Sequence, residues 1–435
     1  MRAYLLVLLV ATATTYLLGG VAGRVATAVG AVPAIRDRDV HESPKPRLGG
    51  LAMLAGIAVA FLVASRLPFL AGQAFAQSHD ARAVLLGSVV ITLVGAVDDV
   101  IGLDAVTKLA GQAVAAGIVV QQGVRLEWLA LPGHTYALSP SIAALATTLV
   151  VVAAANAVNF VDGLDGLAAG VVAIGGSAFF LWCYLLAKQF ELPRASTAGL
   201  IAVALTGACL GFLPHNLYPS RMIMGDSGAL LLGFALATSA VSLTGQLDPA
   251  ALGTVAERGG RGAGETLLPT LLPLLLPLAV VAVPFIELLV SVVRRVLRGR
   301  SPFAPDKKHL HHRLLELGHS HRRAMLVMWI WAAVLSYGVL AIGLHGSRAV
   351  VTAVSVVVVV AIAFTVALPD RAHRRWLRRV RERSAARDLT RGGPVRAPDR
   401  AAAGAPVFVR PVPVAVAVLP DEHPVQAPTA RRPQP

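Results

Sequence analysis

Residues 141–166 read SIAALATTLVVVAAANAVNFVDGLDG, an uncharged apolar run that ends in asparagines and aspartates. A helix needs roughly 20 mostly apolar residues to cross the hydrocarbon core of a bilayer. The run is therefore typical of a membrane-spanning helix. Polar groups in or next to a span are costly, so those at its end indicate a functional site where the helix leaves the membrane.

The rest of the chain repeats this apolar pattern. Of the 435 residues, 56% are hydrophobic and only 14% are charged, which excludes an ordinary soluble enzyme. We expect an all-α, polytopic membrane protein with about 11 transmembrane helices. The predicted spans are residues 3–22, 48–66, 83–97, 106–121, 141–157, 166–187, 198–214, 228–245, 267–291, 325–344 and 348–368.

The basic residues predict how the chain is oriented. With the N-terminus outside and the C-terminus in the cytoplasm, 30 of the 39 lysines and arginines fall on the inner side, in accord with the positive-inside rule. Residues 1–368 form the predicted transmembrane domain, and 369–435 a basic, Pro/Ala-rich, disordered cytoplasmic tail. The net charge of +15 is thus explained by the membrane, and no nucleic acid is expected as a partner.

Polar groups near the span ends sort to one predicted side of the membrane. A purely structural set of polar residues would not sort in this way, so we expect one catalytic face at the cytoplasmic surface of the cell membrane. The residues on this side include Asp98, Asp99, Asp162, Asp165, Asp226, His309, His311 and His312.

Asp98 and Asp99 form an adjacent carboxylate pair at the end of a span. Adjacent carboxylates repel, which raises one pKa and suits a general base. The pair can equally be a cap for the helix that follows. The sequence leaves both interpretations open.

Four polar groups recur at steps of three, at Asn156, Asn159, Asp162 and Asp165. On a continuous helix each step turns the side chain by about 60°, so the groups converge only if the helix ends here. Gly163 and Gly166 favour such a break. Carboxylate and amide oxygens around it are the ligands that Mg²⁺ prefers.

Two further motifs contain residues suited to metals or phosphates. Asp226, in Gly225-Asp226-Ser227-Gly228, stands at a helix start, where it caps the helix or binds a metal, and the glycines let a phosphate or metal approach the backbone. The histidines of His309-Leu310-His311-His312-Arg313 lie among basic residues and are expected to donate to phosphate oxygens. Zinc is the alternative, but no cysteine is near to complete a site.

The remaining motifs and the cysteines complete the prediction of chemistry. Residues 36–50, with mixed charges, two prolines and paired glycines, indicate a shaped loop, or simply a positive anchor before the second span. Cys183 and Cys209 lie in apolar runs, which makes a disulfide or a cysteine metal site improbable. Divalent-cation ligands and phosphate-binding bases in a membrane protein predict phosphoryl or phosphoglycosyl transfer to a lipid.

In order and spacing, these motifs resemble the polyprenyl-phosphate N-acetylhexosamine-1-phosphate transferase superfamily, of the glycosyltransferase 4 type, over residues 1–368. The histidine motif resembles the undecaprenyl- or decaprenyl-phosphate N-acetylglucosaminyl 1-phosphate transferase branch, which uses UDP-GlcNAc and a polyprenyl phosphate. The motifs that carry the resemblance are His41 with Pro46-Arg47-Leu48-Gly49-Gly50; Asp98-Asp99 with Gly102-Leu103, Lys108 and Gln112; the Asn156 to Gly166 segment; Gly225-Asp226-Ser227-Gly228; and His309-Leu310-His311-His312.

The resemblance implies a role for each matching residue. Mg²⁺, or Mn²⁺, would be held by Asp226 with Asn159 or Asp162, and Asp98 or Asp99 would deprotonate or orient the lipid phosphate. The implied substrate-binding residues are Lys45, Asn156, Asp165, Asn216, His309, His311, His312 and Arg313. Ile223 departs from the phenylalanine that relatives often have before the Met-Gly-Asp motif, which weakens the inference about nucleotide stacking.

Two other functions stay open at this point. One is phospho-MurNAc-pentapeptide transfer in peptidoglycan synthesis, whose enzymes usually have three consecutive histidines in the fourth motif. The other is membrane transport, for which charges near the midplane of broken helices would be expected. The sequence also leaves open a homodimer.

Overall fold

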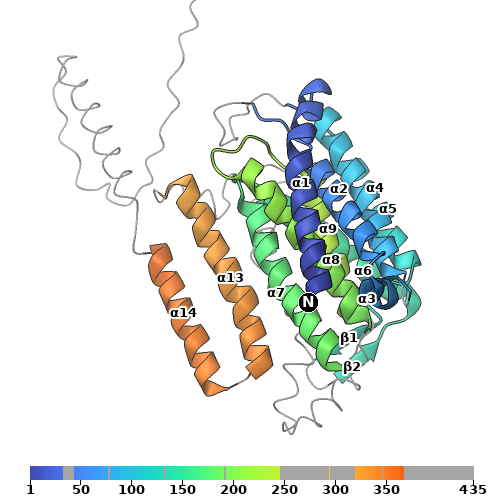
Figure 1. Cartoon of the computed structure of the whole chain (residues 1–435), viewed down its shortest axis with the longest axis vertical. Coiled ribbons are helices and arrows are strands. Elements are labelled where there is room, and N and C mark those ends of the chain that lie inside the picture. Colours follow the sequence, from blue (N-terminus) through green and yellow to red (C-terminus); the bar gives the residue numbers. More distant parts are fainter. Residues whose placement is uncertain are drawn as a thin grey trace, which may run out of the picture. The chain divides into compact units, whose positions relative to one another are not determined.

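A computed structural model describes residues 1–32, 44–76, 79–131, 134–190, 193–244, 293, 319–345 and 347–366. The predicted ninth span and the tail from residue 369 lie outside these ranges. In chain order the elements are α1 (Arg2–Ala28), α2 (Gly49–Ala64), α3 (Pro68–Leu70), the π-helix η1 (Ala71–Phe75), α4 (Asp80–Ile101), α5 (Ala105–Gln121), β1 (Trp128–Leu131), β2 (His134–Ala137), α6 (Pro140–Val161), α7 (Leu167–Phe190), α8 (Pro193–Asn216), α9 (Gly225–Thr244), α13 (His321–His345) and α14 (Arg348–Val366) (Figure 1).

Each of the other ten predicted spans coincides with a helix of the structure. Among the described residues, eight helices are long and apolar enough to cross a membrane by themselves, and α5 is shorter, at 17 residues. The helical, multi-pass class is therefore confirmed. The count of eleven spans and the orientation of the termini stay predictions.

Four short elements have no counterpart among the predicted spans, namely α3, η1, β1 and β2. After α2 the chain bends by 91° into the segment Pro68–Phe75, which contains α3 and η1. Proline at the first position of α3 favours a new helix start, because it lacks an N–H that would need a partner there. Strands β1 and β2 pair antiparallel between α5 and α6, and at four residues each they are too short for an alternating pattern to stand out.

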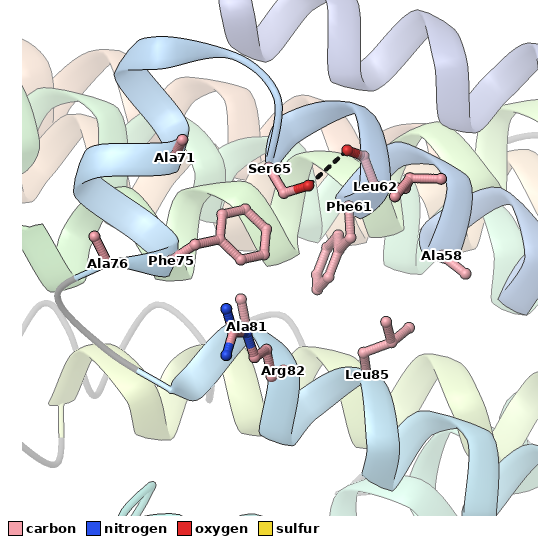
Figure 2. A pocket seen from close by; sticks show the side chains of 10 residues that line it. All are labelled: Ala58, Phe61, Leu62, Ser65, Ala71, Phe75, Ala76, Ala81, Arg82 and Leu85. Atoms are coloured by element: carbon pink, nitrogen blue, oxygen red, sulfur yellow. Dashed lines mark hydrogen bonds between the residues drawn. The ribbon is translucent and has the colours of Figure 1, made fainter.

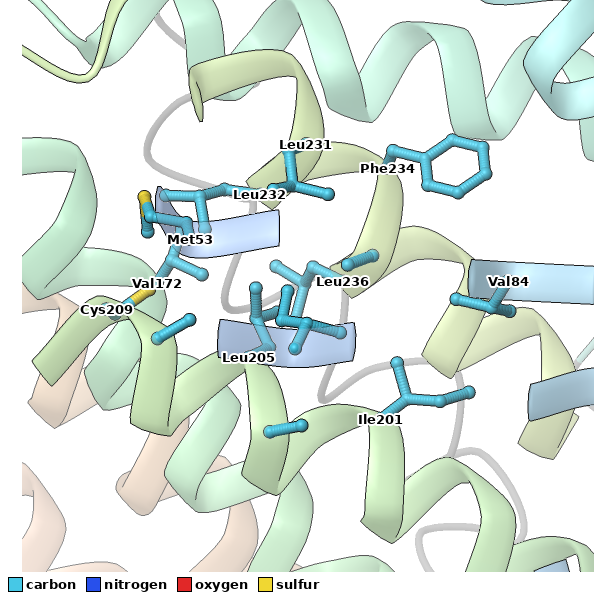
Figure 3. Packing of buried hydrophobic residues seen from close by; sticks show 14 of the residues in the cluster. Met53, Val84, Val172, Ile201, Leu205, Cys209, Leu231, Leu232, Phe234 and Leu236 are labelled. Carbon is cyan, nitrogen blue, oxygen red and sulfur yellow. The ribbon is translucent and has the colours of Figure 1, made fainter. Parts of the chain in front are cut away.

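Helix α9 forms the centre of the bundle. Every residue from 227 to 243 is buried, as expected for a helix that is apolar or small on all sides. The helix packs against α2, α4, α6 and α8. In Figure 3, Leu231, Leu232, Phe234 and Leu236 of α9 lie among apolar side chains of α2, α4, α7 and α8.

Two glycines bring neighbouring helices against the first turn of α9. A Cβ on Gly50 of α2 would overlap the backbone of Ser227, and so would a Cβ on Gly95 of α4. The amide of Gly50 also donates to the carbonyl of Met224 at 3.2 Å. Asp226 lies in the chain between Met224 and Ser227, which these contacts hold, so α2 and α4 fix its position.

A pocket of about 660 Å³ lies between α2, η1 and α4 (Figure 2). Phe61 and Phe75 meet edge to face within it, and Arg82 is its one charged lining residue. Because Arg82 is 16 residues before Asp98 on the same helix, the two are separated by about 24 Å along the helix axis. The pocket is thus remote from the predicted catalytic residues.

Candidate active site

The carboxylate of Asp99 caps helix α9 from the end of helix α4. Its Oδ1 accepts a hydrogen bond from the amide of Asp226 at 2.9 Å, and its Oδ2 accepts one from the amide of Ser227 at 3.0 Å. First-turn amides have no partner within their own helix, so this buried carboxylate satisfies two of them. A helix cap was one of the two roles predicted for the aspartate pair, but we predicted that the pair would cap the helix that follows it, α5. In the structure, Asp104 caps α5.

Gly225 makes the cap possible. Its backbone has φ +70°, which favours glycine, and a Cβ here would overlap the Asp99 carboxylate. We predicted that glycines in this motif would admit a phosphate or a metal. At Gly225 the space is filled by a side chain of the protein itself.

Asp98 faces the other way and contacts helix α5. Its Oδ1 accepts from the amide of Leu103 at 2.7 Å, and its Oδ2 accepts from the ammonium of Lys108 at 3.0 Å. Lys108 also forms an ion pair with Asp226. A single ammonium group therefore bridges the aspartate at the end of α4 and the aspartate at the start of α9.

Asn159, in the last turn of α6, completes this first cluster. Its Nδ2 donates to Oδ2 of Asp226 at 3.4 Å. Amide orientation is assigned from hydrogen bonding, so a turn of the amide would present Oδ1 instead. The cluster offers the carboxylates of Asp98 and Asp226 and the amide oxygen of Asn159 around a position that an ammonium group already occupies. Such oxygen atoms are the ligands that Mg²⁺ prefers. These residues therefore fit a divalent cation.

The predicted break after residue 161 is present. Helix α6 ends at Val161, α7 begins at Leu167, and Gly166 takes φ +76°. Among the described residues, no hydrogen bond or ion pair involves the side chain of Asp162, which follows Val161. Burial raises the pKa of Asp162 to about 7, the carboxylates of Asp99 and Asp165 add to the rise, and Arg47 opposes it.

A second cluster forms around Asp165. Its Oδ2 accepts from Lys45 at 3.2 Å and from the amide of Ser220 at 3.0 Å, and its Oδ1 accepts from the Ser220 hydroxyl at 2.7 Å. Lys45 also donates to the Ser220 hydroxyl at 2.8 Å. The buried Asn216 accepts from the amide of Gly166 and donates to the carbonyl of Met222, both at 3.0 Å. Asn216 thereby joins the α6–α7 break to the loop after α8.

Three of the four polar groups at steps of three have partners in different places, and the fourth, Asp162, has none among the described residues. Asn156 pairs with Gln112 of α5, Asn159 joins Asp226, and Asp165 joins Lys45. The break in the helix therefore serves two neighbouring sites. It does not gather one set of four ligands.

Four residues at the site had no role predicted from their position. Lys108 and Arg47 appeared only as parts of motifs, and Ser220 and Trp329 were not considered. The Nε of Arg47 is buried without a hydrogen-bond partner among the described residues. The indole of Trp329, on α13, donates to the carbonyl of Gly166 at 3.2 Å and so supports the break. Trp329 and Gly166 are more than 160 residues apart in the chain, so no local sequence pattern could have predicted this contact.

The remaining predicted residues lie outside the described ranges. The structure therefore does not test His41 or the histidine motif. The residues concerned in that motif are His309, His311, His312 and Arg313.

Comparison with known proteins identifies related sequences over most of the chain. A family model described as glycosyl transferase family 4 matches residues 81–244. The decaprenyl-phosphate N-acetylglucosaminephosphotransferase of Mycobacterium leprae is 41% identical over 346 residues, which are 78% of this chain and 83% of the relative. A probable undecaprenyl-phosphate N-acetylglucosaminyl 1-phosphate transferase of Bacillus subtilis is 30% identical, over 75% of this chain and 82% of the relative. A phospho-N-acetylmuramoyl-pentapeptide-transferase of Desulforudis audaxviator is also 30% identical, over 69% of this chain and 84% of the relative.

Proposed function

Because the chain belongs to glycosyl transferase family 4, we propose that it transfers N-acetylglucosamine 1-phosphate from UDP-GlcNAc to a polyprenyl phosphate. The products are polyprenyl-diphospho-GlcNAc and UMP. The relative with 41% identity carries the name of this reaction, whereas the pentapeptide transferase is 30% identical. The comparison favours GlcNAc transfer over the peptidoglycan alternative.

One observation of the structure carries the proposal. Asp98 and Asp226 meet around the Lys108 ammonium at the ends of their helices, and Asn159 donates to Asp226. Asp165, three residues after Asp162 in the chain, pairs with Lys45. In transporters, the charged residues that bind the coupling ion are expected near the middle of the membrane, in broken helices. Clustered charge at the helix ends supports chemistry on a lipid phosphate and a soluble nucleotide.

We assign the divalent cation to Asp226, Asn159 and Asp98, since these groups offer the oxygen ligands that Mg²⁺ and Mn²⁺ prefer. When bound, the cation neutralises charge on the diphosphate of the donor. Asp99 acts indirectly, because both of its oxygens hold the first turn of α9 and so position Asp226.

The reaction requires an oxygen of the lipid phosphate to bond to the sugar-bearing phosphorus of UDP-GlcNAc. The bond from that phosphorus to the bridging oxygen breaks, and UMP leaves with the bridging oxygen and its electron pair. Asp162 is suited to take the proton of the incoming lipid phosphate, because its pKa of about 7 is close to the working pH and its side chain has no bonded partner among the described residues. Asp98 helps to orient that phosphate indirectly, because it holds the ammonium of Lys108, which can attract a phosphate oxygen.

We place the nucleotide at the second cluster. Lys45 lies between Asp165 and Ser220 and offers a cation to the diphosphate, while Asn216 holds the backbone on which Asp165 depends. Asn156 pairs with Gln112 and so holds α6 against α5, the helix that carries Lys108. We expect the residues of the His309 to Arg313 motif to donate further hydrogen bonds to phosphate or sugar oxygens.

The chain is a multi-pass membrane protein. We propose that it resides in the cell membrane with the site on the cytoplasmic face, as the distribution of basic residues favours. That face gives access to both a soluble UDP-sugar and a lipid phosphate at the membrane surface.

A substrate panel tests the proposed function. Purified protein is supplied with defined polyprenyl phosphates and radiolabelled UDP-GlcNAc, UDP-GalNAc or UDP-MurNAc-pentapeptide, and the lipid product is extracted. We expect label in the lipid fraction chiefly from UDP-GlcNAc. Preference for the pentapeptide donor would assign the chain to the peptidoglycan branch, and solute uptake by vesicles without turnover would indicate a transporter.

A further inference from the structure

The ammonium group of Lys108 and the proposed divalent cation have the same partners. Lys108 contacts Oδ2 of Asp98 at 3.0 Å and forms an ion pair with Oδ2 of Asp226. Asp226 is also the residue to which we assign the divalent cation. An ammonium and a divalent cation repel at contact distance, so binding of one at these oxygens opposes binding of the other.

From these contacts we propose that Lys108 competes with the divalent cation for the Asp98 and Asp226 carboxylates and is displaced when the cation binds. This inference rests on the proposed function. Lys108 is then a positioning residue that neutralises two facing carboxylates until the cation replaces it.

The geometry allows the side chain to move while its backbone stays in place. Lys108 lies in the first turn of α5, where its amide donates to the carbonyl of Asp104 at 3.1 Å and the Asp104 side chain caps the helix. The side chains of Lys108, Asp98 and Asp226 are 18%, 15% and 22% exposed, so solvent reaches the cluster. A lysine has a flexible four-carbon stem and can release one carboxylate without moving the helix.

Asn159 responds to the same exchange. Its Nδ2 now donates to Oδ2 of Asp226, the oxygen that Lys108 contacts. A cation on that oxygen repels the amide hydrogens, so the amide turns and presents Oδ1 as a ligand. Once displaced, the ammonium of Lys108 is available to a phosphate oxygen of the substrate.

Loss of the Lys108 charge should have opposite effects on metal binding and on turnover. Removing a metal ligand weakens both, whereas removing a competing cation strengthens metal binding even though turnover falls. We expect Lys108→Met to bind Mg²⁺ or Mn²⁺ at least tenfold more tightly than the wild type, a difference of about 1.4 kcal/mol.

Calorimetric titration of the full-length protein with Mg²⁺ or Mn²⁺, in the absence of both substrates, measures this directly. Lys108→Gln is a second neutral variant, and Lys108→Arg keeps the charge and should not bind more tightly than the wild type. Lys45→Met is the matched control, because it removes the same charge from a lysine paired with Asp165. Its metal affinity should stay within about twofold of the wild type.

The outcomes separate this inference from the proposed function. If the wild type binds metal and Asp226→Ala does not, yet the neutral Lys108 variants bind no more tightly, Lys108 is not a competitor. If Lys45→Met tightens binding equally, general charge repulsion explains the effect and the inference is wrong. If the wild type binds neither cation, the metal assignment of the proposed function fails instead.

A measurement on the unmodified protein guards against variants that do not fold. An amine-reactive reagent labels accessible lysines, and mass spectrometry quantifies labelling at Lys108 with and without Mg²⁺. Displacement predicts severalfold faster labelling at Lys108 with Mg²⁺ and no change at Lys188, which lies near the end of α7. Equal or slower labelling of Lys108 overturns the inference.

Discussion

Asp99→Asn should destabilise the folded protein because it removes half of the cap on helix α9. The carboxylate accepts from two backbone amides at 2.9 and 3.0 Å, and asparagine has one acceptor oxygen. The NH₂ group that replaces the other oxygen faces an N–H donor, so one hydrogen bond is lost and one buried donor is left unpaired.

The magnitude follows from those two changes. A hydrogen bond to a charged group contributes about 1.5–3 kcal/mol, and an unpaired buried donor costs about 1–3 kcal/mol. Removing a buried negative charge offsets part of this cost. We therefore expect the free energy of unfolding to fall by about 2–4 kcal/mol, with Asp226 displaced and turnover reduced as a consequence.

Asp98→Asn is the matched control. Its remaining Oδ1 can still accept from Leu103, and the ammonium of Lys108 keeps its ion pair with Asp226. This variant should keep its stability within about 1 kcal/mol and its UDP affinity, yet lose most of its kcat.

Denaturant titration in mixed micelles measures stability for both variants, and UDP calorimetry with a turnover assay measures function. Equal stability of Asp99→Asn and the wild type would refute the assignment of Asp99 as the cap of α9. Normal turnover of Asp98→Asn would remove Asp98 from the catalytic residues.

Three further expectations follow from the same contacts. Because Asp162 must be deprotonated to accept a proton, activity should rise with pH through about 7, and Asp162→Asn should have lower kcat without that rise; an unchanged pH profile would contradict its role. Gly50→Ala places a methyl group against the backbone of Ser227 and should lower stability by about 1–3 kcal/mol, and a thermal melt that matches the wild type would show that α2 can shift freely. Lys45→Met should raise KM for UDP-GlcNAc more than it lowers kcat, because Lys45 and Asp165 lie where we place the nucleotide, and a pure kcat effect would move Lys45 to the reacting phosphate.

The sequence predicted those features that depend on neighbouring residues. Uncharged runs located the helices, and Gly163 with Gly166 located the end of α6, because hydropathy and backbone freedom are local properties. The hard-oxygen residues of the first cluster were also recognised from their chemical type.

The pairings across the bundle were not predictable. Asp99 is 127 residues before Asp226 in the chain, and the choice of α9 as its capped helix depends on how closely Gly50 and Gly95 let three helices approach. The bridging position of Lys108 depends on the same approach. A pattern along the chain carries no information on such distances until the helices are packed.

Release of UMP from UDP-GlcNAc by the purified protein, with and without polyprenyl phosphate, tests the central claim most directly. We expect UMP release only when the lipid phosphate is present, with one polyprenyl-diphospho-GlcNAc formed for each UMP, and no release by Asp226→Ala. Equal UMP release without the lipid would contradict phosphosugar transfer, and so would release of UDP instead of UMP.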